Sequence, residues 1–200
     1  MLIISPLSSR RGGRGEVKAA EKKQSPKENH PIKPPAKCKL TMNEQLTIKR
    51  TTGRDPDFEL LIRQLDNELW NEMNEVQATY DQFNKVPDID TVLLIYRNGN
   101  VIACGCFKKY RNDTVEIKRM FTVKEERGKG IASIVLSELE KWAVELKFQY
   151  VILETGIKLQ SAIQLYKKSG YAITENYDQY IGLEQSVCMK KELIAIIKQL

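Results

Sequence analysis

The segment 127–132 combines glycines with basic residues at the expected start of a helix. Arg127 and Lys129 each precede a glycine, and an apolar run with helical spacing follows. The first turn of a helix leaves N–H groups without intrahelical acceptors and carries the positive end of the helix dipole. Glycine lets the backbone approach a ligand closely because it has no Cβ. The pattern therefore predicts a site for a phosphate-bearing ligand.

Two common phosphate-binding loops fit this segment poorly. A P-loop ends in Gly-Lys-Ser/Thr, whereas Gly130 follows Lys129 here. A dinucleotide fingerprint needs glycine or alanine at the position of Ser133, and it follows a parallel strand. The strand expected before this loop belongs to an antiparallel meander. A basic, glycine-rich turn without a ligand is the remaining alternative.

Periodicity along the chain predicts a mixed α/β fold in the order β-α-α-β-β-β-α-β-α-β-β. Asp55 before Pro56 marks a helix start, and Asn98-Gly99 is typical of a tight hairpin turn. The expected strands are 45–51, 91–97, 100–109, 114–123, 150–154, 171–174 and 185–191. The expected helices begin at Pro56 and cover 71–83, 130–146 and 160–169.

The cysteine and histidine content excludes several chemistries. Cys104 and Cys106 lie two residues apart, on one face of an expected strand, and the single histidine is His30. A Cys/His zinc site is therefore not expected, and neither is any other metal. The domain also lacks the histidine of a Ser-His or Cys-His catalytic pair. We expect reduced, buried thiols and a cytoplasmic location, and the sequence has no apolar run long enough for a membrane span.

The net charge of +6 comes from the first part of the chain. Residues 1–41 hold ten basic and three acidic residues, together with many Pro, Ser and Gly. We predict a disordered basic tail over 1–41 and a folded domain over 42–200. Met42 is a possible native start, and the three glutamates argue against a transit peptide. Because the domain is nearly neutral, we do not expect it to bind nucleic acid.

The loop and its surroundings resemble the GNAT superfamily of N-acetyltransferases. Residues 127–132 match its motif Arg/Gln-x-x-Gly-x-Gly/Ala, and Leu165–Tyr171 is similar to its later signature Leu-Tyr-x-x-x-Gly-Phe/Tyr. The resemblance extends from about Leu46 to Leu193. It implies a twisted, mainly antiparallel sheet of six to seven strands, about four flanking helices and splayed central strands. It also implies acetyl-CoA as the co-substrate.

The resemblance assigns cofactor contacts along the loop and the strand before it. The backbone of Phe121, Thr122 and Val123 would pair with the pantetheine arm. The pyrophosphate would be held by Arg127, Gly128, Lys129, Gly130, Ile131 and Ala132. Relatives often carry Asn or Gln where Leu159 stands, and the shift to Gln160 puts that cofactor contact in doubt.

The same resemblance suggests Tyr166 and Glu116 as catalytic residues. Tyr166 would protonate the leaving thiolate, and Glu116 would take a proton from the amine. Glu154 is a competing base, while Tyr166 could also be a core aromatic and Glu116 a surface ion-pair partner. Strict alternation would place two sets of residues on opposite faces, Glu116, Lys118 and Met120 against Ile117, Arg119 and Phe121.

We therefore predict transfer of an acetyl group to a primary amine by direct attack in a ternary complex. The acceptor would be a small molecule or a peptide, and the protein a monomer or homodimer. An acidic rim on the early helices could attract a cationic amine. Tyr177 and Tyr180 could line the acceptor pocket, or they could be exposed residues of a turn. The rim residues are Asp57, Glu59, Asp66, Glu68, Glu72 and Glu75. One alternative is a sensor that binds acyl-CoA without turnover. The other is a protein that binds nucleic acid through the tail.

Overall fold

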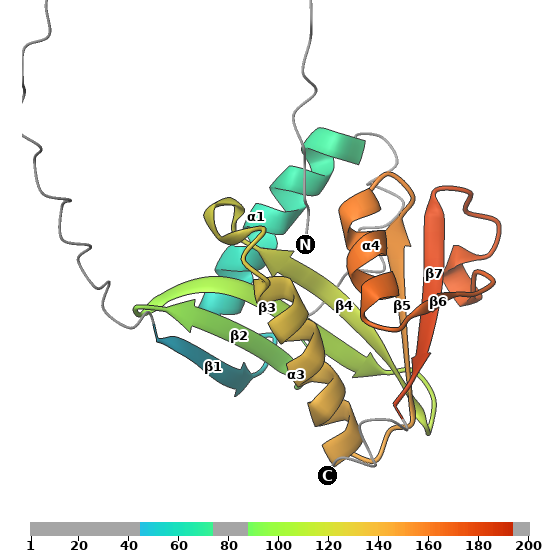
Figure 1. Ribbon diagram of the computed structural model, residues 1–200, viewed down its shortest axis with the longest axis horizontal. Helices are drawn as coiled ribbons and strands as arrows, with labels where there is room; N and C mark the ends of the chain where they lie inside the picture. The colour runs from blue at the N-terminus through green and yellow to red at the C-terminus, as the bar shows by residue number, and fades with distance from the viewer. Residues whose placement is uncertain (1–44, 74–87, 194–200) are drawn as a thin grey trace, which may run out of the picture. The chain divides into compact units, whose positions relative to one another are not determined.

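The computed structural model describes residues 45–73 and 88–193, which form one seven-stranded sheet with helices on both faces (Figure 1). The strand order is β1-β2-β3-β4-β5-β7-β6. The strands are β1 Leu46–Thr51, β2 Val92–Arg97, β3 Asn100–Lys109, β4 Thr114–Thr122, β5 Tyr150–Gly156, β6 Ala172–Ile173 and β7 Ser186–Glu192. The helices are α1 Pro56–Met73, α3 Ile131–Glu145 and α4 Gln160–Lys168, with 3-10 turns η2 Lys124–Glu126 and η3 Asp178–Tyr180. The expected mixed, mainly antiparallel sheet is confirmed.

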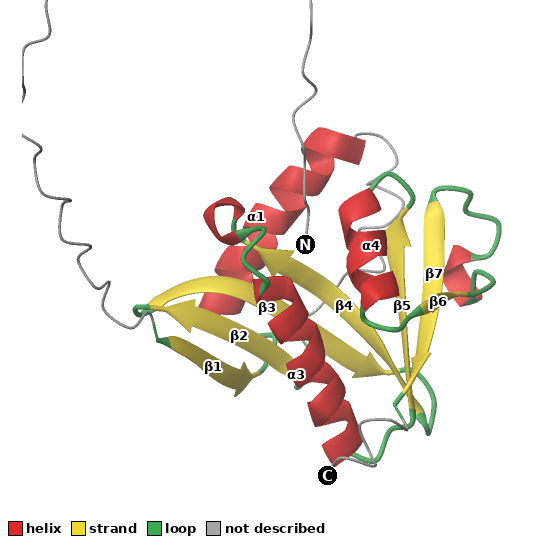
Figure 2. Cartoon of the chain, viewed as in Figure 1, coloured by secondary structure: helices red, strands yellow, loops and turns green. Residues whose placement is uncertain are grey.

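The helices differ slightly from expectation. The described residues contain three α-helices, where about four were expected (Figure 2). Residues 71–73, where the second helix was expected to begin, belong to α1, and the rest of that expected helix, 74–83, lies outside the described residues. The tail over 1–41 lies outside them too. Within the described helices, none is both long enough and apolar enough to cross a membrane.

Local sequence signals account for the first half of the sheet. β1, β2, β3 and β4 pair in sequence as antiparallel neighbours. The turn between β2 and β3 uses positive φ at Asn98 and Gly99, as the Asn-Gly pair predicts. Helix α1 begins after Asp55, whose carboxylate accepts the N–H of Asp57 at 3.0 Å. These short-range features define the β2–β3 hairpin and the start of α1.

Two apolar clusters cover opposite faces of the sheet. On one face, Phe58, Leu61 and Leu65 of α1 pack on residues of β2, β3 and β4. On the other face, α3 and α4 pack on the sheet in a larger cluster that includes Val135 and Tyr166. Because α1 lies opposite α3 and α4, groups on the two faces can meet only where strands part.

Gly105 allows α3 to approach strand β3 closely. A Cβ at this position would lie 2.7 Å from the sulfur of Met120, 2.8 Å from Val135 Cγ1 and 2.9 Å from Leu139 Cδ1. Such distances are too short for any side chain, so glycine is needed for this packing. The glycine thus sets how closely the helix that follows the 127–130 loop packs on the sheet.

The three cysteines of the described residues are buried free thiols, as expected. Burial raises the pKa of the Cys106 thiol to about 12, and that of Cys104 rises as well for the same reason. A thiol with so high a pKa is a poor nucleophile at neutral pH, because the thiolate is the reactive form.

Candidate functional site

Strands β4 and β5 part half-way along their length. Their parallel pairing covers only Thr114–Ile117 and Tyr150–Leu153. Beyond this point β4 continues beside β3, and β5 continues beside β7 (Figure 1). The facing edges of β4 and β5 therefore leave backbone groups available there, and the expected splay is confirmed.

The 127–130 loop and the start of α3 present a row of backbone donors. Gly128 and Gly130 adopt φ of 78° and 79°, and no atom lies where their Cβ atoms would be. Within the described chain, no backbone carbonyl accepts the N–H groups of residues 128–132. Open space, free donors and the positive end of α3 suit an anionic group such as a pyrophosphate.

The two cations of this loop have different environments. Lys129 leaves 52% of its side chain exposed and pairs with Glu126 at 3.2 Å. Arg127 exposes only 9% of its side chain and pairs with Glu68 of α1 at 2.6 Å. Its Nε also donates to the carbonyl of Thr122 at 2.9 Å. Lys129 is thus accessible to a ligand, whereas Arg127 is turned into the protein.

The end of β4 offers its backbone on one side only. Phe121 and Thr122 pair with Cys104 and Ala103 of β3, and the N–H of Val123 donates to Ile102 at 2.9 Å. The Phe121 side chain is buried under α1. Phe121 can therefore contact a ligand in the splay through its backbone and not through its side chain.

A bulge at Arg119 makes the predicted alternation of β4 wrong. Cys106 faces Lys118 and Cys104 faces Phe121, so β4 has one extra residue between these pairs. Arg119 takes up the extra length with a φ of 58°. Its guanidinium reaches Asp66 of α1, while Met120 packs on the face of α3. Lys118 and Phe121 therefore share a face, and Met120 does not lie with Glu116.

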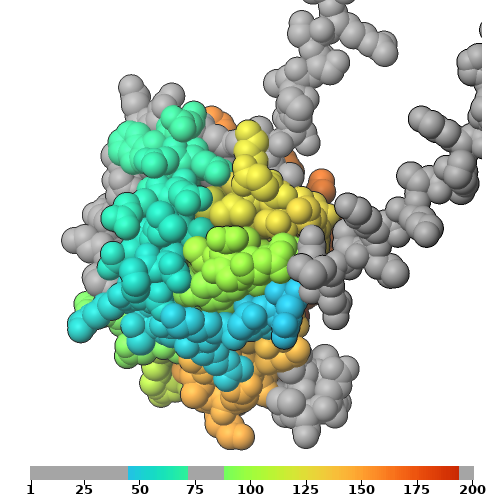
Figure 3. Space-filling view, turned by 90° about the vertical axis from the view of Figure 1, so that its left-hand side faces the viewer, coloured from blue at the N-terminus to red at the C-terminus, as the bar shows by residue number. Residues whose placement is uncertain are grey.

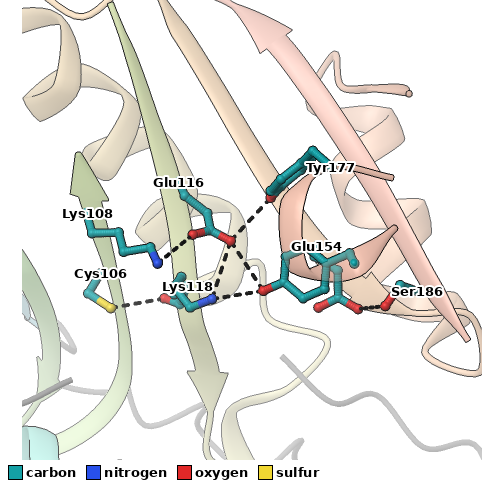
Figure 4. Close-up of polar contacts among 8 residues, drawn as sticks. Cys106, Lys108, Glu116, Lys118, Glu154, Tyr177 and Ser186 are labelled. Carbon is teal, nitrogen blue, oxygen red and sulfur yellow. Dashed lines mark hydrogen bonds and ion pairs between the residues drawn. The ribbon is translucent and has the colours of Figure 1, made fainter. Parts of the chain in front are cut away.

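Glu116 lies buried at the centre of a polar cluster (Figure 4). Its carboxylate pairs with Lys108 at 3.1 Å and with Lys118 at 3.3 Å. It also accepts hydrogen bonds from the Tyr177 and Tyr180 hydroxyls at 3.2 and 3.3 Å. Burial lowers the pKa of Lys118, because it disfavours the charged ammonium. Glu116 thus fastens the η3 segment onto β4.

Glu154 lies beside this cluster with fewer partners. Its Oε1 accepts a hydrogen bond of 2.7 Å from the Ser186 hydroxyl of β7 (Figure 4). Burial raises the pKa of Glu154 to about 7, Ser186 and Lys118 oppose the rise, and Glu116 adds to it. Its neighbour Leu153 packs in the cluster of α3 and α4, so alternation turns Glu154 to the other face.

Tyr166 lies in the apolar cluster on the face of α3 and α4. It is 5% exposed, and its ring centroid lies 5.8 Å from that of Tyr171. Burial raises its pKa, and the charge of Glu154 adds to the rise. The Gln160 side chain, at the start of α4, donates to the Ile157 carbonyl at 2.7 Å, so it braces its own loop.

Three acids of the expected rim on α1 form hydrogen bonds or ion pairs with other side chains of the protein. Asp57 accepts the Tyr96 hydroxyl at 2.8 Å, while Asp66 and Glu68 pair with arginines. Glu59 is exposed, and nothing is described of the side chains at 72 and 75. Of the four rim acids whose side chains are described, three therefore serve as internal partners, and Glu59 alone is left exposed.

The family model for the acetyltransferase (GNAT) family matches residues 59–171. The chain is 27% identical over 151 residues to a protein named IAA acetyltransferase from Azospirillum brasilense, a match that covers 72% of this chain and 97% of that protein.

Solved structures show the same architecture. One is an acyl-CoA N-acyltransferase, so named provisionally, from Klebsiella pneumoniae, with a TM-score of 0.63 and 29% identity over 76% of this chain and 99% of that one. Another is an N-acetyltransferase from Thermoplasma acidophilum in complex with coenzyme A, with a TM-score of 0.58 and 15% sequence identity. That match covers 74% of this chain and 99% of the Thermoplasma chain. The second match bears on the fold alone.

Proposed function

The chain belongs to the acetyltransferase (GNAT) family and is an acyltransferase, and on this premise we propose that it transfers an acetyl group from acetyl-CoA to a primary amine. The acceptor would be a small molecule or a peptide. The observation that carries this proposal is the parting of β4 and β5 beside Glu154, which lies on the face opposite the α3 and α4 cluster that contains Tyr166. A thioester in the opening would have a base and an acid on opposite sides.

Acetyl-CoA fits the groups present on the loop and on β4. The N–H groups of Gly128–Ala132 and the Lys129 ammonium would hold the pyrophosphate. The edge of Phe121–Val123 that faces away from β3 would hydrogen-bond the pantetheine arm, beside the Thr122 carbonyl that already accepts Arg127 Nε. An N–H near Phe121 would polarise the thioester carbonyl. The supporting observations are the open space at both glycines and the lack of carbonyl partners for the loop amides in the described chain.

Glu154 is the base that the contacts favour. The attacking amine must lose a proton, and a base works best when its pKa lies near the working pH. The carboxyl of Glu154 meets this condition with a pKa of about 7. Glu116, the first choice from the sequence, already accepts from two lysines and two phenols. We infer that Glu116 positions the η3 segment, and Glu116→Gln compared with Glu154→Gln tests this division.

Tyr166 is the proposed acid. The amine nitrogen attacks the thioester carbon, the C–S bond breaks, and the sulfur needs a proton. Tyr166 would donate it, and the proton lost by the amine would pass to Glu154, so that the charges balance. Burial raises the pKa of Tyr166 and so keeps the phenol protonated before the reaction, but it also makes the phenol a weaker acid. The transfer to sulfur therefore depends on the leaving thiolate forming next to the Tyr166 hydroxyl. No residue is acylated, which agrees with the unreactive environment of the buried cysteines.

Titration calorimetry and a thiol assay separate this enzyme from a sensor that only binds acyl-CoA. The chain is titrated with acetyl-CoA, and thiol release is then followed over a panel of primary amines. The name of the Azospirillum relative adds IAA as a further candidate acceptor, tested beside the amines. We expect binding and thiol release with at least one acceptor. Binding without release on any acceptor would favour the sensor, and absence of binding would contradict both.

A further inference from the structure

Two ion pairs join α1 to the two arginines that border the open end of β4. Arg119 NH2 lies 2.8 Å from Asp66 Oδ1, and Arg127 NH2 lies 2.6 Å from Glu68 Oε2. The arginine side chains are 5% and 9% exposed. Figure 3 shows this face of the molecule, where α1 lies beside the yellow segment that follows β4. Helix α1 therefore contacts both ends of the strand edge that faces the splay.

Arg127 makes three kinds of contact within the protein. Its NH2 group donates to both oxygens of Glu68, at 2.8 and 2.6 Å. Its Nε donates to the Thr122 carbonyl, and its guanidinium carbon lies 5.6 Å from the centre of the Phe121 ring. The side chain thus runs from the loop back across the end of β4 to α1.

We propose that Glu68 is a positioning residue for the cofactor loop, and that Arg127 acts through Glu68 as a brace instead of binding the pyrophosphate. This inference rests on the proposed function, because it concerns how the same loop receives acetyl-CoA. It also reassigns Arg127, whose place in the family motif suggests a cofactor ligand. Lys129, with its exposed side chain, remains as the phosphate-facing cation.

The need for such a brace follows from the glycines. Gly128 and Gly130 have open space where a side chain would lie, so no side chain of their own restricts these two positions of the loop. The preceding turn is held by the ion pair of Glu126 with Arg97 at 3.1 Å. Ordering a glycine-rich segment costs conformational entropy, and a site ordered in advance avoids that cost during binding. Arg127 immediately precedes Gly128, so the contact with Glu68 fixes one end of the loop while α3 fixes the other.

A double-mutant cycle on acetyl-CoA affinity tests the brace. We compare the full chain with Glu68→Gln, Arg127→Gln and the double variant, and use Glu59→Gln, an exposed acid of the same helix, as the control. Both single variants should weaken acetyl-CoA binding by about tenfold, the scale of one charge-assisted hydrogen bond. The double variant should be no weaker than either. In turnover assays, Glu68→Gln should raise the KM for acetyl-CoA and leave kcat unchanged.

Two results would overturn the brace. One is unchanged affinity in Glu68→Gln. The other is a loss of acetyl-CoA affinity in Arg127→Gln that is larger than the loss in Glu68→Gln, with the double variant showing the sum of the two losses. That result would make Arg127 a phosphate ligand.

Amide hydrogen exchange without cofactor tests the brace independently of the proposed function. The amides of Val123, Glu126 and Arg127, each hydrogen-bonded in this segment, should exchange faster in Glu68→Gln than in the unmodified chain or in Glu59→Gln. Equal exchange would overturn the brace. A chain that binds no acetyl-CoA at all would contradict the proposed function, while exchange would still decide on Glu68.

Discussion

The carboxylate of Glu154 accepts a hydrogen bond of 2.7 Å from the Ser186 hydroxyl on the neighbouring strand. This bond stabilises the ionised carboxylate and so opposes the rise in its pKa that burial causes. Two distant segments, β5 and β7, thereby set the protonation of one group. Three predictions follow from this relationship, and two more concern Tyr166 and Gly105.

Replacing Ser186 by Ala should raise the pKa of Glu154 further, because the carboxylate loses a donor while its burial remains. If Glu154 is the base, the rise of kcat/KM with pH should move to higher pH. The profile of the unmodified enzyme serves as reference, and Ser137→Ala on α3 as a matched control. If the pH profile of kcat/KM is the same in Ser186→Ala as in the unmodified enzyme, Ser186 does not influence the pKa of the base.

Glu154→Gln should lower kcat by about a hundredfold, the usual contribution of general base catalysis. It should also flatten the increase of activity around pH 7, because the titrating group is gone. Steady-state kinetics from pH 5.5 to 9, a range of about three and a half units around that pKa, checks both effects. If Glu116→Gln shows these kinetic losses instead and Glu154→Gln does not, the base is Glu116.

Glu154 should also make stability depend on pH. Its folded pKa of about 7 lies above the ordinary value of 4.5, so the folded state holds a proton that the unfolded state releases. Its contribution is fully present below pH 4.5 and is lost as the pH rises through about 7. The free energy of unfolding should fall over this range by at most about 3 kcal/mol. Thermal melts of Glu154→Gln should lack that part of the slope.

Tyr166→Phe should reduce kcat by about a hundredfold while leaving acetyl-CoA affinity nearly unchanged, because the ring is kept and only the acid is removed. Calorimetry and initial rates measure the two quantities separately. Tyr150→Phe, at the start of β5, is the control. Unchanged turnover in Tyr166→Phe would mean that Tyr166 serves the core only.

Gly105→Ala should destabilise the fold by about 1–3 kcal/mol, the usual cost of overpacking a core. The added methyl would push against Met120, Val135 and Leu139. Chemical denaturation provides the measurement. Gly99→Ala adds a methyl in open space at a positive φ, so its cost is backbone strain alone, about 1 kcal/mol. A loss well below about 1 kcal/mol in Gly105→Ala would contradict the close packing of α3 on β3.

The sequence alone determined the features that depend on neighbouring residues. The Asn98-Gly99 turn, the start of α1 at Pro56 and the glycine loop before α3 were all predicted correctly, because backbone preference and periodicity are short-range properties. The family resemblance added the parting of two central strands, which the pairing of β4 and β5 confirms.

Only the tertiary structure decided how the charged side chains are used. The bulge at Arg119 interrupts the simple alternation of β4. The apolar periodicity of the sequence does not reveal such a one-residue insertion. Arg127 and Glu68 are 59 residues apart, so no local pattern pairs them. The pKa of Glu154 depends on burial and on groups from β4 and β7. Such effects arise between segments that are distant in the sequence. They exist only once the fold has brought those segments together.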